Sequence, residues 1–464
     1  MTTYSAVRDD ALGSGDMTDL LLALERREVS PDELMSAARD RLADADGALN
    51  ALVRTTEVEL APGPLHGIPT VLKDNLDLAG YPTREGSRAV PDIPKPSDSA
   101  LTAELKALGL GILGKSTLPE FGLTATTEPL LTGPTRNPWN LDHSTGGSSG
   151  GSAALVAAGA VPIGHANDGG GSIRIPASCC GLVGLKPSRG RVTDAESEKY
   201  LPVSIAAEGV VTRTVRDAAL LYNLLERPMP GGAAPIGHVT VPSPRRLRIA
   251  LITGSVLGTP VDPEVTAAVD AAARQLADLG HHVEPTTLPF GEQFARDFLR
   301  YWATLAAALR LGGPRIYGDA WDPDGLEPLT NELADFCGTM ALSVPATIAR
   351  LRRFRDTYEA FFADYDVLIS PVLAAPPVPL GYIGAEVEPR TQLVRLLRYA
   401  SFTAPQNVAG APAITLPAQL STNGTPIGVH LGGAHGSEAM LLGLAYEFEA
   451  ATRASLPRYP GDSV

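Results

Sequence analysis

The sequence predicts an α/β protein in which helices cover a β-sheet in layers. Short apolar segments alternate with longer segments of helical periodicity along most of the 464 residues. The clearest unit is a β-α-β pattern formed by residues 247–253, 263–279 and 282–287. Gly280 ends its helix, whose apolar stripe consists of Val265, Ala268, Val269, Ala272, Leu276 and Leu279. No repeat and no low-complexity linker interrupts this order, so we expect a single domain over residues 1–464.

Composition excludes several classes of protein. The chain is 44% hydrophobic and 19% charged, which is typical of a globular protein with a large core. Its net charge of −14 at pH 7 argues against a nucleic-acid partner and against an anionic membrane surface. The N-terminal residues have neither a basic start nor an apolar segment, so we expect a cytoplasmic protein. The sequence leaves open whether the chain forms a homodimer.

The three cysteines carry no metal or disulfide pattern. Cys179 and Cys180 are adjacent, and Cys337 is far from both. An odd, low number without spaced pairs argues against a disulfide framework and against a zinc site. We therefore expect Cys179 and Cys180 to be buried free thiols, and we expect no metal and no other cofactor.

The N-terminal region predicts two helices, at residues 18–27 and 31–46. Ser30 is the expected N-cap of the second helix, because Pro31 follows it and Glu33 completes a capping box. Both helices are expected to pack on the outside of the core.

The next elements lead to a lysine. Residues 66–72 predict a strand that delivers Lys73 at its end. Asp98 is the expected cap of a helix that Gly109 ends, and a short buried strand at residues 112–113 follows. We place the catalytic core at about residues 60–220.

The remaining segments complete the alternation. Helices are expected at residues 153–160, 214–225 and about 438–452, and strands at 161–165, 367–369 and 413–416. Residues 290–363 are mainly helical and poor in motifs, so we expect them to form a variable surface that shapes the substrate site.

Residues 144–176 are the most informative part of the sequence. No Asp, Glu, Lys or Arg lies between Asp142 and Asp168. The segment is nevertheless too short for a membrane span, because only about a dozen mainly apolar residues follow Ser152 and a span needs roughly 20. Glycine pairs bracket Ser148 and Ser149, and Gly169, Gly170 and Gly171 precede Ser172. Glycine allows the backbone to approach a ligand closely, so this pattern indicates a reaction centre.

Ser172 is the better candidate nucleophile. Consecutive N–H groups of Gly169, Gly170, Gly171 and Ser172 can point into one concavity and stabilise an oxyanion. Asp168 and Arg174 lie on either side of this loop among apolar residues, so we expect a buried ion pair that fixes the loop.

A serine hydroxyl needs a base, and no histidine lies beside Ser172 in the sequence, so the base must come from elsewhere in the chain. Lys73 is a lysine whose neighbours set it apart from a surface residue. A lysine with a pKa of about 10.4 is neutral roughly once in 2,500 at pH 7. The apolar residues before Lys73 favour its burial, which disfavours the charged form. Ser149 is expected to support the site.

Two other motifs are present. Residues 109–116, GLGILGKS, satisfy the P-loop pattern, but a helix precedes them and their centre is apolar, so a helix end followed by a buried strand is the better interpretation. Residues 146–150 satisfy the G-x-S-x-G pattern of an α/β-hydrolase. That alternative would make Ser148 the nucleophile of an esterase and would need His281, His430 or His435.

The chain resembles the amidase signature family. The resemblance lies in GGSSGGS, GGGSIRIP and CGLVGLKPSRGRV, together with GIPTVLKDN at 67–75 and GAPAITLP at 410–417. It implies a large mixed central β-sheet with helices on both faces, and hydrolysis of a small amide through an acyl-enzyme. It also implies a triad of Lys73, Ser148 and Ser172, with a cis peptide bond between Gly147 and Ser148.

The resemblance extends to two kinds of member. FTAPQNVAGAPAITLP is similar to bacterial amidases, including the 6-aminohexanoate cyclic dimer hydrolases. The amidotransferase subunit that acts on misacylated tRNA is the alternative within the family. That subunit typically has SIRQPA and KPTYGRVS where this chain has SIRIPA and KPSRGRV.

Overall fold

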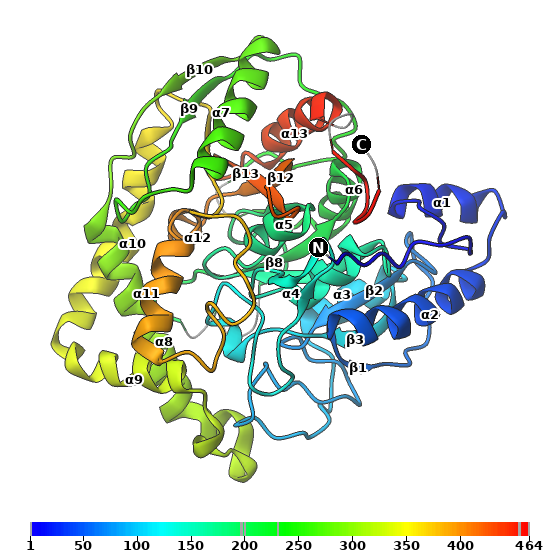
Figure 1. The fold of residues 1–464 in the computed structure, drawn as a ribbon, viewed down its shortest axis with the longest axis horizontal. Helices are drawn as coiled ribbons and strands as arrows, with labels where there is room; N and C mark the ends of the chain where they lie inside the picture. Colours follow the sequence, from blue (N-terminus) through cyan, green and yellow to red (C-terminus); the bar gives the residue numbers. More distant parts are fainter. Residues whose placement is uncertain (1, 195–197, 199–200, 230–231, 453–455, 463–464) are drawn as a thin grey trace.

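A computed structural model describes residues 2–194, 198, 201–229, 232–452 and 456–462. In these residues eleven strands form one mixed sheet, in the order β1-β3-β2-β6-β8-β7-β12-β13-β11-β9-β10. Helices lie on both faces of the sheet (Figure 1). The α/β class that the alternating pattern predicts is confirmed.

The strands of this sheet are short and mostly buried. Their bounds are β1 (Leu52–Thr55), β2 (Pro69–Lys73), β3 (Gly111–Ser116), β6 (Ile163–Asp168), β7 (Val183–Lys186), β8 (Ala207–Thr212), β9 (Arg248–Leu251), β10 (His282–Pro285), β11 (Val367–Pro371), β12 (Ala413–Leu420) and β13 (Pro426–Gly433). A separate hairpin consists of β4 (Arg136–Asn137) and β5 (Asn140–Ser144).

The helices surround the sheet and also form a group beside it. Their bounds are α1 (Met17–Glu25), α2 (Pro31–Leu49), α3 (Ala100–Ala107), α4 (Gly150–Ala157), α5 (Arg174–Cys180), α6 (Val215–Leu225), α7 (Pro263–Asp278), α8 (Glu292–Tyr317), α9 (Pro328–Thr339), α10 (Val344–Phe361), α11 (Pro389–Tyr399), α12 (Ala404–Ala409) and α13 (Glu438–Thr452). Figure 1 shows α8, α9, α10 and α11 gathered on the left. The helical character predicted for residues 290–363 is confirmed.

Local capping signals predicted one helix start correctly and another wrongly. Ser30 caps α2 in a reciprocal capping box with Glu33, as expected. The expected cap of α3 is wrong, because Ser99 caps that helix instead of Asp98. The Asp98 carboxylate is occupied elsewhere: it accepts hydrogen bonds from Ala79 N–H at 2.8 Å and from Lys106 Nζ at 2.7 Å.

The P-loop pattern forms a buried strand. Residues 111–116 are β3, and Lys115 is fully buried in an ion pair with Asp74 at 2.9 Å. The β-α-β unit also has its predicted topology, because β9 and β10 pair in parallel and α7 connects them.

Two neighbouring strands determine where the candidate site lies. β2 pairs in parallel with β6, with Thr70 opposite Ile163 and Val71 opposite Gly164. The carboxyl ends of parallel strands meet at one edge of a sheet. Lys73, the last residue of β2, therefore lies beside the end of β6, where Asp168 stands.

Candidate active site

The end of β6 turns around the carboxylate of Asp168. Its Oδ1 accepts the Gly171 N–H at 2.7 Å, and its Oδ2 accepts the Ile173 N–H at 3.2 Å. Arg174 donates to both oxygens, from Nε at 2.8 Å and from Nη2 at 2.9 Å. The expected buried ion pair is therefore present, and both side chains are inaccessible to solvent. Burial opposes ionisation, but Arg174 more than offsets it and holds the pKa of Asp168 well below its usual range.

Arg174 connects this loop to other parts of the sheet. Its Nη2 donates to Asn407 Oδ1 at 2.6 Å, and its Nη1 lies 3.0 Å from His430 Nε2. Asn407 Nδ2 also donates to Asp168 O at 2.7 Å. The short helix α12, which carries Asn407, thus helps to fix the loop before Ser172.

The expectation for the Gly171 N–H needs correction. That N–H donates to Asp168 instead of pointing into an open concavity. Gly171 has φ +138°, and an added Cβ would lie 2.6 Å from Ile175 Cδ1, so the position is restricted to glycine. In the described residues no hydrogen bond occupies the N–H groups of Gly169, Gly170 and Ser172.

Lys73 lies between the polar side chains of Ser148 and Asn167. Its Nζ donates to Ser148 Oγ at 2.7 Å and to Asn167 Oδ1 at 2.6 Å. Its side chain is fully buried. Burial lowers the pKa of Lys73 to about 7, against the opposing effect of the carboxylates of Glu208, Asp168 and Glu85. A substantial fraction of Lys73 is thus neutral at pH 7 and able to accept a proton.

The segment before α4 brings Ser148 to this lysine. The peptide bond between Gly147 and Ser148 is cis, as the resemblance implies. A Cβ at Gly147 would lie 2.8 Å from the backbone of Thr126, so this segment packs against its neighbour through glycine. Ser149 Oγ donates to Asn167 O at 3.3 Å and accepts the Asn167 N–H at 3.4 Å. Ser149 therefore holds the Ser148 segment against the end of β6.

The two serines differ in their access to open space. Ser172 lines a narrow cavity of about 80 Å³ together with Gly147 and Gly170. Ser148 is 2% exposed and lies behind this surface, next to Lys73. A substrate in the cavity would therefore meet the Ser172 hydroxyl first.

Sequence reasoning missed three polar residues beside Lys73. Asn167 binds Lys73 Nζ directly. His165 Nε2 lies 2.8 Å from Glu208 Oε2, and His165 Nδ1 accepts the Lys73 N–H at 3.3 Å. The position of Asn167, immediately before Asp168, could have indicated it. Glu208 could not be found, because its strand, β8, was not predicted.

The histidines required by the α/β-hydrolase alternative are engaged elsewhere. His430 contacts Arg174 through Nε2 and Ser370 through Nδ1, at 3.0 and 3.2 Å. His281 Nε2 lies 2.9 Å from Glu447, and its Nδ1 accepts the Leu247 N–H at 3.0 Å. Within the described part of the chain, no hydrogen bond joins His281, His430 or His435 to Ser148.

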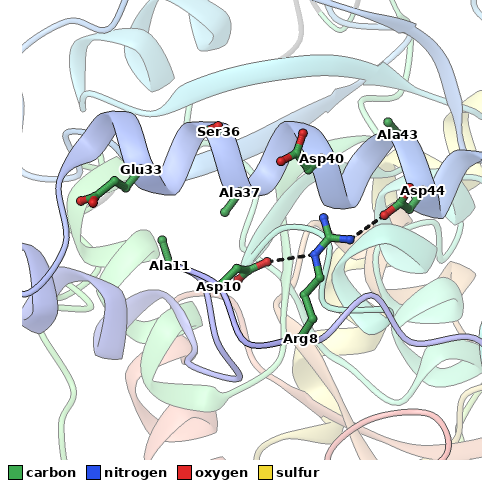
Figure 2. Close-up of a pocket in the computed structure, with 9 residues that line it drawn as sticks. All are labelled: Arg8, Asp10, Ala11, Glu33, Ser36, Ala37, Asp40, Ala43 and Asp44. Atoms are coloured by element: carbon green, nitrogen blue, oxygen red, sulfur yellow. Dashed lines mark hydrogen bonds and ion pairs between the residues drawn. The ribbon is translucent and has the colours of Figure 1, made fainter.

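A second hollow lies on the surface beside α2. Figure 2 shows Arg8 between Asp10 and Asp44, at distances of 3.2 and 2.6 Å. Glu33 and Asp40 extend from α2, the helix that also carries Asp44. This hollow shares no residue with the cavity at Ser172, and its Arg8 is paired with the carboxylates beside it.

Neither a metal site nor a membrane-spanning helix is found among the described residues. No group of three or more His, Cys, Asp or Glu residues among them is placed to hold a metal ion. No described helix combines the length and the apolar character that crossing a membrane requires.

Comparison with known proteins shows the family. A family model described as Amidase matches residues 21–442. The chain belongs to the amidase family. The amidase is 44% identical over 462 residues to a Mycobacterium tuberculosis protein named "Putative amidase AmiC", and the match covers 97% of each chain. It is 32% identical to a glutamyl-tRNA(Gln) amidotransferase subunit of Halothermothrix orenii, over 92% of this chain and 95% of that one.

A solved structure shows the same fold. The structure of 6-aminohexanoate cyclic dimer hydrolase superposes on the amidase with a TM-score of 0.86 and 31% identity, covering 96% of this chain and 98% of that one. The amidase signature fold that the resemblance implied is thus confirmed. The chain is an amide hydrolase.

Proposed function

We propose that this amidase cleaves carboxylic amides with Ser172 as nucleophile, Ser148 as proton relay and Lys73 as terminal base. The observation that carries the proposal is the 2.7 Å hydrogen bond between Lys73 Nζ and Ser148 Oγ. It joins a buried lysine, whose pKa is lowered to about 7, to a serine beside the cavity that Ser172 lines. A neutral amine in that place can accept the proton that a serine nucleophile must lose.

In the first half-reaction, Ser172 Oγ attacks the amide carbonyl. Its proton passes to Ser148 Oγ, and the Ser148 proton passes to Lys73 Nζ. The N–H groups of Gly169, Gly170 and Ser172 donate to the oxyanion of the tetrahedral intermediate. The proton returns through Ser148 to the leaving nitrogen, and the C–N bond breaks to leave an ester of Ser172. No metal or other cofactor is required for these steps.

In the second half-reaction, water attacks the ester carbonyl. Lys73 and Ser148 take a proton from the water and return one to Ser172 Oγ as the acid leaves. Asp168 and Arg174 touch neither the substrate nor the transferred proton. Their role is to hold the loop of residues 169–172 in place, and Ser149 does the same for the Ser148 segment.

The test is covalent trapping followed by peptide mass mapping. A phosphonyl fluoride should add once per chain, on Ser172. Ser172→Ala should abolish both the adduct and amidase activity, whereas Ser148→Ala should keep Ser172 present but slow its labelling severely. An adduct on Ser148 of the unmodified protein, with Ser172 free, would overturn the assignment and favour the α/β-hydrolase alternative.

Activity of the single chain separates this function from that of an amidotransferase subunit. The purified chain should hydrolyse simple amides without ATP, magnesium or any partner chain, and EDTA should leave the rate unchanged. Activity that appears only with partner chains and misacylated tRNA would contradict the proposal. A cytoplasmic location stays a prediction, which cell fractionation would test. Whether the chain forms a homodimer stays open, and light scattering would decide it.

A further inference from the structure

The cavity at Ser172 is lined almost entirely by apolar groups. None of its fifteen described lining residues is ionisable, and Ser172 and Thr124 carry its only hydroxyl groups. Thr124 Oγ1 is already engaged, because it donates to Thr126 O at 2.8 Å. The cavity therefore offers a substrate one hydroxyl, that of Ser172, together with the backbone N–H groups beside it.

Helix α8 supplies an aromatic wall directly over the loop of residues 169–172. Phe298 and Trp302 lie one turn apart, with stacked rings whose centroids are 5.5 Å apart. A Cβ added at Gly170 would lie 3.3 Å from Phe298 Cζ, and one added at Gly169 would lie 3.8 Å from the Trp302 ring. Both aromatic side chains are only partly buried, and the cavity is the space that they face.

This wall is held in place from both sides. Trp302 Nε1 donates to Leu123 O at 3.2 Å, which ties α8 to the opposite wall of the cavity. On the far side of α8, Asp297 is nearly fully buried and accepts two hydrogen bonds of 2.6 Å from Arg350 of α10. The aromatic wall is thus preorganised, so little ordering is needed when a ligand binds.

Helix α11 supplies the second apolar wall. Leu393, Leu396 and Leu397 lie on the cavity side of this helix. Val394 belongs to the same helix but is 47% exposed and is not among the lining residues. The spacing of three and four residues places the three leucines on one face.

We propose that this cavity is an acyl pocket that accepts uncharged, apolar acyl groups and excludes acyl groups that carry a charge. The inference rests on the proposed function, because Ser172 must keep the acyl group bonded through both half-reactions while the amine departs. A charge buried here would meet no partner, and burying an unpaired charge is far more costly than burying a methylene group is favourable. The apolar walls of α8 and α11 therefore select the substrate.

Matched substrate pairs test this proposal. Replacing the carboxylate of a glutaryl group by an isopropyl group of similar shape gives the neutral 5-methylhexanoyl group, and replacing the ammonium of 6-aminohexanoyl by methyl gives heptanoyl. All four are prepared as p-nitroanilides. We expect kcat/KM to rise roughly fourfold for each methylene from acetyl to hexanoyl until the pocket is full. Each charged member of a pair should be at least 100-fold poorer than its neutral partner, and equal rates would overturn the proposal.

A positive charge added to the α11 wall should weaken the selection against anionic acyl groups. Leu393 is a half-buried lining residue, so Leu393→Arg adds a guanidinium to the α11 wall on a stem long enough for the charge to reach water. The ratio of kcat/KM for glutaryl to that for 5-methylhexanoyl should rise at least tenfold. Val394→Arg is the matched control, because it adds the same charge one residue away on the exposed face, and its ratio should stay within twofold of the unmodified enzyme. An equal rise in both variants would show a general field effect and contradict a pocket.

A binding measurement separates this proposal from the proposed chemistry. Ser172→Ala protein is titrated with neutral 5-methylhexanamide and with anionic glutaramate, and binding is followed by tryptophan fluorescence, with Trp302→Phe to identify the responding ring. Neutral amide should bind at least 100-fold more tightly. Failure of Ser172 labelling with this preference intact would overturn the mechanism alone, whereas equal binding of both ligands would overturn the acyl pocket alone.

Discussion

Lys73 Nζ donates a hydrogen bond of 2.6 Å to Oδ1 of Asn167, a residue that carries no charge. A neutral acceptor orients the lysine without favouring its protonated form as strongly as a carboxylate would. Asn167→Asp should therefore move the inflection of the pH–rate profile up by at least one unit, because an adjacent negative charge raises the pKa of Lys73. The profile of kcat/KM against pH measures this shift.

Asn167→Leu is the matched control for that variant. It has a similar shape but neither the acceptor nor the charge. Its kcat should fall about 10-fold to 100-fold as Lys73 loses its orientation, with no upward shift of the inflection. An unchanged profile in Asn167→Asp would separate Asn167 from the ionisation of the site.

The pH dependence of the unmodified enzyme follows from the burial of Lys73. In the proposed mechanism the base acts only when it is neutral, and the pKa of Lys73 is about 7. Activity should thus rise with pH through an apparent ionisation near 7 and level off above about pH 8, while exposed lysines are still charged. This apparent value belongs to the coupled triad and not to Lys73 alone.

Substitutions at Lys73 should confirm or exclude it as the base. Lys73→Ala removes the base, and Lys73→Arg should be no better, because a guanidinium stays protonated. Substitutions of Lys73, Ser148 and Ser172 should be strongly non-additive in kcat, since the three act as one unit in the proposed mechanism. Near-normal kcat in Lys73→Arg would remove Lys73 from the mechanism.

Two neighbouring glycines should respond very differently to alanine. At Gly171 the new Cβ would collide with Ile175 and Thr403, and φ is +138°. Gly171→Ala should therefore abolish activity and lower the melting temperature. At Gly169 the nearest atom is 3.8 Å from the new Cβ, so Gly169→Ala should keep the melting temperature within about 2 °C, a shift that corresponds to at most ~1 kcal/mol in a domain of this size. Calorimetry and activity assays of both variants provide the comparison.

The buried pair of Asp168 and Arg174 should dominate local stability. Asp168→Asn leaves the Arg174 charge buried and incompletely paired, which should cost about 3–5 kcal/mol in the free energy of unfolding. The pair of half-buried Arg310 and exposed Asp335, 2.9 Å apart, is the control, and Asp335→Asn should cost at most ~1 kcal/mol. Urea denaturation measures both values.

The buried pair of Asp168 and Arg174 also predicts how the stability of the protein changes at acid pH. The pKa of Asp168 is lower in the folded protein than in the unfolded chain. Its contribution to stability is therefore fully present above the unfolded value of about 3.9 and is lost as the pH falls through the folded value. The Asp168→Asn variant should lack this part of the acid dependence, and identical acid profiles of the two proteins would contradict it.

The local structure of the candidate site could be predicted from the sequence where the pattern is local. The glycines around Ser148 and before Ser172, and the apolar residues before Lys73, identify backbone approach and burial without any knowledge of distant contacts. The capping box of α2 succeeded for the same reason, since all of its hydrogen bonds lie within four residues. The cap of α3 failed because Ala79, nineteen residues away, occupies Asp98.

What the sequence determined alone was thus the α/β class, the family, and the residue types at the centre of the candidate site. Tertiary structure alone decided which groups surround them. β2 and β6 are separated by 89 residues of chain, from Lys73 to Ile163, yet they pair in parallel and bring Asn167 to the lysine. Glu208 reaches the same place from β8, and the apolar walls of the cavity at Ser172 come from α8 and α11. Such contacts depend on the register of strands and the packing of helices, and no short window of sequence encodes either of these.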